Sequence, residues 1–135
     1  MGLPEAPPPG SSLLPKGSFE GQVVVVTGGG TGLGKSIAVE FARIGASVAI
    51  WSRSAEHRAA GVAAVESVGA KAHAFEVDIR SPESVAAAFD DVAKHWHLPE
   101  TLINNAAGNF PVPAEDMSPN AWRTVTDIVL NGTFY

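Results

Sequence analysis

A run of valines that ends in a glycine-rich turn constrains this chain more than any other feature. The valines occupy residues 23–26 and the turn residues 28–34. Consecutive β-branched residues favour a strand buried on both faces of a sheet, and the glycines allow a sharp turn that a ligand can approach closely. Apolar periodicity from Ser36 to Ile44 then predicts a helix. The first N–H groups of a helix attract anions, so the unit predicts a site for a phosphate-bearing ligand.

Two ligand classes fit this turn. Residues 29–36 satisfy the nucleoside-triphosphate pattern G-x-x-x-x-G-K-[ST], in which Lys35 reaches phosphates and Ser36 holds Mg²⁺. Residues 27–34 instead read T-G-x-x-x-G-x-G, a variant of the dinucleotide-binding turn. The commoner G-x-G-x-x-G spacing is not met, because Leu33 stands in place of its last glycine. The turn alone does not separate the two interpretations.

Composition limits the remaining possibilities. The chain has 135 residues, a net charge of −5, 45% apolar residues and no cysteine. These values predict one small domain with a packed core and exclude a disulfide or a thiolate metal site. Scattered Lys and Arg residues argue against nucleic acid as a partner, and no apolar run is long enough to span a membrane. We expect residues 1–17, rich in Pro, Ser and Gly, to form a flexible lead-in without a targeting signal, before a domain over 18–135.

Strand and helix patterns alternate along that domain. Turn and cap signals, such as Ser81-Pro82 and Ser118-Pro119, separate them. We expect an α/β fold of the Rossmann type, a doubly wound parallel sheet with helices on both faces. The pattern stops after four strands, with the fourth at an open edge, so we expect a fragment of a longer protein. The further strands are predicted at 47–51, 71–77 and 102–104, and the further helices at 55–68, at 82–96 and from 119.

Residues at the ends of the later strands favour a dinucleotide. Arg53 follows the second strand, where an acid would bind the 2′-hydroxyl of NAD and a guanidinium instead fits the 2′-phosphate of NADP; a solvated surface arginine is the alternative. Asp78 follows the third strand and fits either class, as a magnesium ligand or as an acceptor for the adenine amino group. The small residues of Asn105-Ala106-Ala107-Gly108 allow a flat ligand to lie against the backbone, and the amides can tie neighbouring strands together. A triphosphate loop does not need that last segment.

Together these motifs resemble the short-chain dehydrogenase/reductase family, over about residues 18–133. Within the family, three segments are similar to 2,4-dienoyl-CoA reductases: residues 27–35, residues 103–110, and residues 118–122 with 126–133. On this resemblance the triphosphate pattern is a coincidence of Lys35 and Ser36 following the last glycine. The resemblance implies NADP(H) as cofactor, an acyl-CoA substrate and a homo-oligomer, commonly a tetramer.

The resemblance also implies a role for individual residues. Asn131 matches the catalytic asparagine, which holds a water beside a catalytic lysine, and we expect a local irregularity at Asn131-Gly132 because glycine disfavours a helix interior. Arg80 is a candidate for the substrate site, with an ion pair at the start of a helix as its alternative. The other residues matched to the substrate site are Asn109, Phe110 and Ser118. The residues matched to the cofactor site are Gly28, Gly29, Gly30, Thr31, Gly32, Leu33, Gly34, Arg53, Asp78, Asn105, Ala106, Ala107 and Gly108.

The implied reaction is a hydride transfer from NADPH to a conjugated dienoyl thioester in unsaturated fatty-acid oxidation. The Ser…Tyr-x-x-x-Lys group that polarises the substrate in this family does not occur, since Tyr135 is the only tyrosine. We therefore expect these 135 residues to be inactive alone. Three alternatives stay open: another substrate such as a 3-oxoacyl thioester, a non-catalytic dinucleotide-binding module, and a triphosphatase. We expect no metal site at His95-Trp96-His97 and a cytoplasmic location, with an organelle matrix as the alternative.

Overall fold

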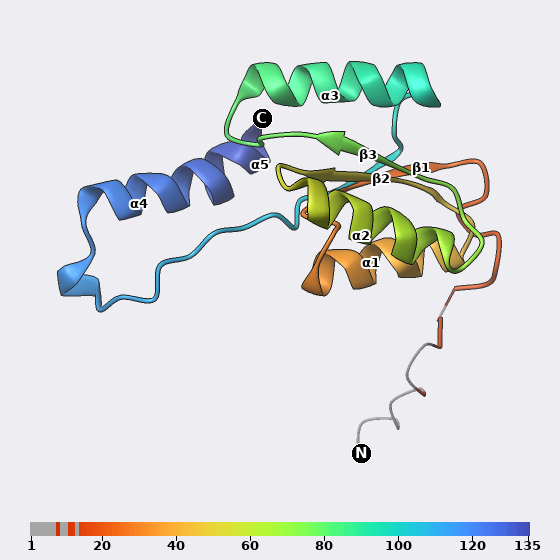
Figure 1. The fold of residues 1–135 in the computed structure, drawn as a ribbon, viewed down its shortest axis with the longest axis horizontal. Helices are drawn as coiled ribbons and strands as arrows, with labels where there is room; N and C mark the ends of the chain where they lie inside the picture. The colour runs from red at the N-terminus through yellow and green to blue at the C-terminus, as the bar shows by residue number, and fades with distance from the viewer. Residues whose placement is uncertain (1–7, 9–10, 13) are drawn as a thin grey trace, which may run out of the picture.

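The computed structural model describes residues 8, 11–12 and 14–135, so most of the predicted lead-in lies outside the described residues. Four parallel strands form one sheet in the order β3-β2-β1-β4 (Figure 1). The strands are β1 (Val23–Thr27), β2 (Ser47–Ser52), β3 (Ala72–Glu76) and β4 (Thr101–Ile103). The predicted fold class is confirmed. β4 lies at one edge of the described sheet, where Leu102 is 41% exposed.

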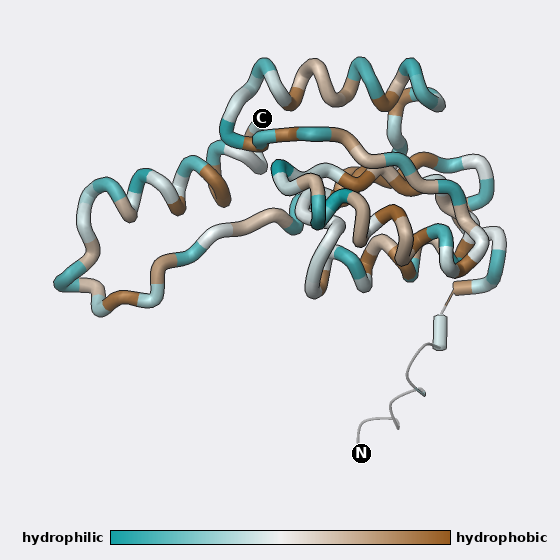
Figure 2. The backbone as a smooth tube through the Cα atoms, viewed as in Figure 1, coloured by the Kyte–Doolittle hydropathy of each residue, from teal (hydrophilic) through white to brown (hydrophobic). Residues whose placement is uncertain are grey.

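The valine run packs in both directions, as its sequence predicts. Val23 and Val25 face one hydrophobic cluster with Trp51, while Val24 and Val26 face a second cluster. Helices α1 (Gly32–Arg43) and α2 (Ala55–Glu66) cover the second cluster, and α3 (Pro82–His95) covers the first on the opposite face (Figure 1). The apolar colour of Figure 2 accordingly concentrates in the sheet between the helices. Alternate side chains of a strand point to opposite faces, so a central strand needs apolar residues at every position.

The cap signals fix the helix starts. Ser81 and Ser118 each accept a hydrogen bond from the backbone N–H three residues later, with proline at the first helical position, as the sequence predicts. One helix start differs: α1 begins at Gly32, four residues before the predicted start at Ser36. The sequence pattern does not indicate this start, because its first turn contains two glycines and glycine disfavours helix. In the structure the glycine turn continues directly into the helix.

The chain leaves the sheet after Ile103. After β4, a long loop with a short 3₁₀ turn, η1 (Ala114–Asp116), leads to α4 (Pro119–Thr126), which projects away from the strands in Figure 1. A π-helical turn, η2 (Asp127–Asn131), and α5 (Gly132–Phe134) continue it. The irregularity predicted near Asn131 is therefore confirmed as a π turn. Within the described part of the chain, no helix has the length and apolar character needed to cross a membrane.

Candidate functional site

A cleft of about 510 Å³ opens at the carboxyl ends of the strands. In the strand order β3-β2-β1-β4 the chain places β2 and β3 on one side of β1 and β4 on its other side, and open α/β sheets bind ligands at such a change in strand order. Segments that follow all four strands meet around the cleft. Its lining residues are Gly28, Thr31, Gly32, Leu33, Gly34, Trp51, Ser52, Arg53, His57, Val77, Asp78, Ile79, Arg80, Asn105, Ala106, Ala107, Gly108 and Ile128.

The glycine turn forms the floor of the cleft. Gly28 and Gly32 adopt positive φ angles of 66° and 49°, which side chains disfavour. A Cβ atom on Gly34 would lie 2.4 Å from the carbonyl oxygen of Gly28 and 2.4 Å from Nδ2 of Asn105. These positions therefore require glycine, and they leave the start of α1 open toward the cleft. Backbone N–H groups in such a place suit an anionic group.

Two predicted glycines lie elsewhere. Gly29 and Gly30 are buried and do not line the cleft. A Cβ on Gly30 would lie 2.0 Å from the carbonyl oxygen of His57, so this glycine lets α2 approach the turn. The residues required by the triphosphate pattern also miss the cleft: Lys35 and Ser36 do not line it, and the Ser36 hydroxyl donates to the carbonyl of Gly32 at 3.3 Å.

Asn105 ties the end of β4 to the end of β1. Its Nδ2 donates to the carbonyl of Thr27 at 2.8 Å. The Thr27 hydroxyl in turn accepts from the backbone N–H groups of Asn105 at 3.0 Å and Ala106 at 2.9 Å, and donates to the carbonyl of Ile103 at 3.3 Å. The predicted tie between neighbouring strands is confirmed, and it holds the 105–108 backbone against the glycine turn.

The corner between β2 and α2 presents Arg53 to the cleft. In the described chain the Arg53 guanidinium is exposed and makes neither a hydrogen bond nor an ion pair. Beside it lie Ser52 and His57, which the sequence analysis missed. A signal existed for His57, because it lies in the first turn of the predicted helix that follows Arg53. Together with the hydrogen bond from Arg80, the charge of Arg53 lowers the pKa of Asp78 across the cleft. The corner thus offers a cation with free hydrogen-bond donors at the mouth of the cleft.

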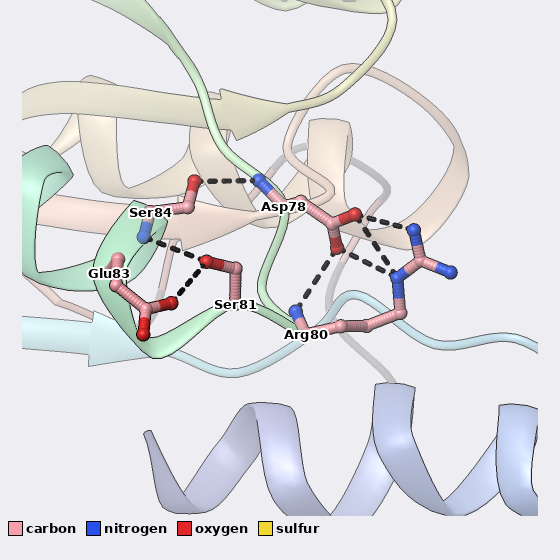
Figure 3. A network of polar contacts seen from close by, with 5 residues as sticks. All are labelled: Asp78, Arg80, Ser81, Glu83 and Ser84. Carbon is pink, nitrogen blue, oxygen red and sulfur yellow. Dashed lines mark hydrogen bonds and ion pairs between the residues drawn. The ribbon is translucent and has the colours of Figure 1, made fainter.

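The corner between β3 and α3 holds a network of polar contacts (Figure 3). Nε of Arg80 donates to Oδ1 of Asp78 at 2.9 Å, and Nη2 of Arg80 donates to Oδ2 of Asp78. The backbone N–H of Asp78 donates to the Ser84 hydroxyl at 3.1 Å. Hydrogen bonding from Arg80 lowers the pKa of Asp78 to about 2, so the carboxylate is charged at neutral pH. Both side chains line the cleft, and Arg80 forms the ion pair weighed as its alternative role.

Apolar residues form the walls between these corners. Val77 and Ile79 flank Asp78, and Ile128 approaches from η2. None of these three residues, nor Trp51, belongs to a motif that the sequence predicts for the site. Val77 and Ile79 lie just after β3, where residues on either side of Asp78 in an extended segment share the face opposite to Asp78.

The residues predicted for substrate binding and catalysis do not all join the cleft. Asn109, Phe110, Ser118 and Asn131 do not line it. The Ser118 hydroxyl caps α4, and Nδ2 of Asn131 donates to Oδ1 of Asp127 at 2.9 Å. Among the described residues, no group of three His, Cys, Asp or Glu side chains is arranged to hold a metal ion.

The sequence matches the family described as short chain dehydrogenase over residues 22–135. An uncharacterized oxidoreductase of Caenorhabditis elegans is 50% identical over 127 residues, which cover 93% of this chain and 41% of that protein. A probable 2,4-dienoyl-CoA reductase of the same organism is 44% identical, covering 92% and 41%. A peroxisomal 2,4-dienoyl-CoA reductase of Arabidopsis thaliana is 42% identical, covering 84% and 38%.

Among solved structures, the citronellol catabolism dehydrogenase of Pseudomonas aeruginosa superposes with a TM-score of 0.86 at 32% identity. The match covers 91% of this chain and 50% of that one. The chain therefore spans about two fifths of the curated relatives it matches and about half of this structural neighbour.

Proposed function

The chain belongs to the short-chain dehydrogenase family, and from this premise we propose that it supplies the cofactor-binding half of an NADPH-dependent 2,4-dienoyl-CoA reductase. The family accounts for an oxidoreductase and a nicotinamide dinucleotide. The choice of NADPH and of a dienoyl thioester goes further. It rests on Arg53 and on the printed names of relatives 42–44% identical to this chain.

The observation that carries the cofactor assignment is the Arg53 guanidinium, whose donors make no hydrogen bond within the described chain. In a dinucleotide cleft of this kind the end of β2 faces the adenosine ribose. The side chains there, Ser52 and Arg53, include no carboxylate to accept from a 2′-hydroxyl. A planar cation with free donors instead suits a 2′-phosphate, which can bind it through two parallel hydrogen bonds.

Other residues of the cleft support the assignment of the rest of the cofactor. Gly28, Gly32 and Gly34 leave a surface without side chains at the start of α1, where a diphosphate can accept from backbone N–H groups. The charged Asp78 offers an acceptor for the adenine amino group, and Ala106 to Gly108 offer a flat wall. The nicotinamide, when bound, supplies the hydride. The chain's own residues bind and orient it.

We assign the substrate and catalytic residues by the same family reasoning. Asn109, Phe110 and Ser118 lie on the loop before α4 and at its cap, and Arg80 reaches the cleft from the β3–α3 corner. Asn131 lies in the π turn, where the helix widens; such turns recur at functional sites. The Tyr and Lys that polarise a thioester oxygen would come from residues that follow Tyr135, so these 135 residues alone would turn over no substrate.

The direct test is a reaction of the protein expressed from its complete reading frame. We expect NADPH oxidation with a 2,4-dienoyl-CoA and a 3-enoyl-CoA product by mass spectrometry, and no product from the 135-residue chain. Faster turnover of a 3-oxoacyl-CoA would overturn the substrate assignment. Binding of NADPH without turnover of either thioester would favour the non-catalytic module.

Assembly and location remain predictions. The homo-oligomer, a tetramer by family resemblance, is tested by light scattering of the same protein. The predicted cytoplasmic location, with an organelle matrix as the alternative, is tested by a fluorescent fusion. The name of the Arabidopsis thaliana relative places that protein in peroxisomes.

A further inference from the structure

Arg58 lies behind the corner that carries Arg53. Its Nη1 donates to two consecutive backbone carbonyls, those of Ser52 at 2.8 Å and Arg53 at 2.9 Å. Its Nη2 donates to Oε2 of Glu76, at the end of β3, at 2.9 Å. The Arg58 side chain is only 17% exposed, whereas that of Glu76 is 75% exposed. One guanidinium thus joins α2, the end of β2 and the end of β3.

The sheet itself supplies little hydrogen bonding at this corner. Ser52 and Glu76 are the last register pair, and among the described residues the only sheet contact to the Ser52 carbonyl after it is a long one of 3.5 Å from the N–H of Val77. The Arg58 guanidinium supplies the hydrogen bonds instead. The planar fork of arginine reaches both carbonyls and the carboxylate at once, which a lysine ammonium cannot do in the same geometry. The backbone that bears the Arg53 side chain is therefore held by Arg58.

We propose that Arg58 is a positioning residue for 2′-phosphate recognition, acting through Arg53. Arg58 does not line the cleft, and its charge is paired with Glu76, so it orients the corner rather than contacting the ligand. This inference rests on the proposed NADPH preference. It goes beyond that preference by assigning the selectivity to a pair of arginines, of which only one faces the cofactor.

A double-mutant cycle tests the proposal in the protein from the complete reading frame, with the ratio of the Kd for NADH to the Kd for NADPH as readout. Arg53→Ala should lower this ratio about tenfold or more. Arg58→Met, which keeps the apolar stem, should lower it about three- to tenfold while the Kd for NADH changes less than about twofold. The Arg53→Ala/Arg58→Met protein should match Arg53→Ala alone.

Each other result has a definite meaning. Equal weakening of NADPH and NADH by Arg58→Met would mean a general structural role and would overturn the proposal. Full additivity of the two substitutions would mean that Arg58 acts independently of Arg53, which overturns it too. If Arg53→Ala leaves the ratio unchanged, the proposed NADPH preference itself fails.

Glu76→Gln is a control variant that is expected to fold. It keeps an acceptor for Arg58 but removes the charge, and Glu76 is exposed. We expect this variant to keep the far-ultraviolet circular dichroism of the parent and to retain most of the selectivity, because the two carbonyl contacts persist. An Arg58→Lys variant should lie between parent and Arg58→Met. A Lys variant with full selectivity would contradict the need for the planar fork.

Discussion

Thr27 and Asn105 hold each other by two hydrogen bonds: the Asn105 side-chain amide donates to the Thr27 carbonyl at 2.8 Å, and the Thr27 hydroxyl accepts from the Asn105 backbone N–H at 3.0 Å. This pair joins the central strand to the edge strand at the floor of the cleft. The same contacts therefore hold the end of β1 and the 105–108 backbone that lines the cleft.

Removing the Thr27 hydroxyl should destabilise the fold. Thr27→Val keeps the shape but leaves the N–H groups of Asn105 and Ala106 without their acceptor, at a cost of about 1–3 kcal/mol. Thr27→Ser keeps the hydroxyl and is the matched control. Urea unfolding of the three proteins measures the difference. A Thr27→Val protein as stable as Thr27→Ser would contradict the role of the hydroxyl.

Gly30 tests the packing of α2 against the turn. A Cβ at this position would lie 2.0 Å from the backbone oxygen of His57, and backbone cannot move aside cheaply. Gly30→Ala should therefore lower the free energy of unfolding by about 3 kcal/mol or more. Gly69→Ala, at an open site with a φ of 83°, is the control. Gly69→Ala should cost only about 1–2 kcal/mol of backbone strain. A greater loss of stability for Gly69→Ala than for Gly30→Ala would contradict the packing argument.

His97 should make stability depend on pH. Its Nδ1 lies 2.9 Å from the Leu98 carbonyl and its Nε2 3.2 Å from the Gly21 carbonyl. Carbonyls only accept, so the imidazolium satisfies both contacts. The Leu98 carbonyl and the Glu100 charge raise the pKa of His97. Because the folded pKa is raised, this stabilisation is complete below about pH 6.5 and is lost as the pH rises through the folded value.

The measurement is unfolding free energy against pH for the parent and His97→Gln, where the gap should be wider at acid than at alkaline pH. His73 gives the opposite sign as an internal control. Burial and the charge of the stacked His95 lower the pKa of His73. The contribution of neutral His73 to the free energy of unfolding is complete above the ordinary histidine pKa and falls as the pH decreases. A His97→Gln gap that widens toward alkaline pH would be inconsistent with the contacts described.

Asp78 should affect all dinucleotides equally. Asp78→Asn removes the charge that Arg80 pairs with and weakens the proposed adenine acceptor, so the Kd values for NADPH and NADH should rise together by about threefold or more. Glu83→Gln changes a carboxylate of the same network that does not line the cleft, and should leave both values unchanged. A loss confined to NADPH would place Asp78 by the 2′-phosphate instead of the adenine.

The sequence was sufficient for the sheet and its caps because local signals and packing agree there. The valines of β1 leave no polar face, so both faces of the strand must be covered. In Ser81-Pro82 the serine suits the N-cap and the proline suits the first helical position, which marks where the helix starts. The sequence was insufficient where a residue's role depends on which element packs behind it. Gly29 and Gly30 belong to the same motif as Gly28 and Gly34, but α2 packs against one pair and the cleft opens over the other.

Other residues of the site and its support depend on tertiary contacts in the same way. Arg58 lies five residues after Arg53 on a helix with no sequence signal that its guanidinium turns back to the strand end. The apolar walls formed by Val77 and Ile79 carry no motif, and only the assembled sheet places them beside Asp78. The roles of these residues therefore follow from how side chains pack in the folded chain, which the local sequence pattern does not encode.

The most direct test of the account is calorimetric titration of the protein from the complete reading frame with NADPH, NADH and Mg-ATP in separate runs. We expect NADPH to bind at least about tenfold more tightly than NADH, and Mg-ATP to bind weakly. Tight binding of Mg-ATP without binding of NADPH would contradict the central claim that the glycine turn and Arg53 together recognise a phosphorylated dinucleotide.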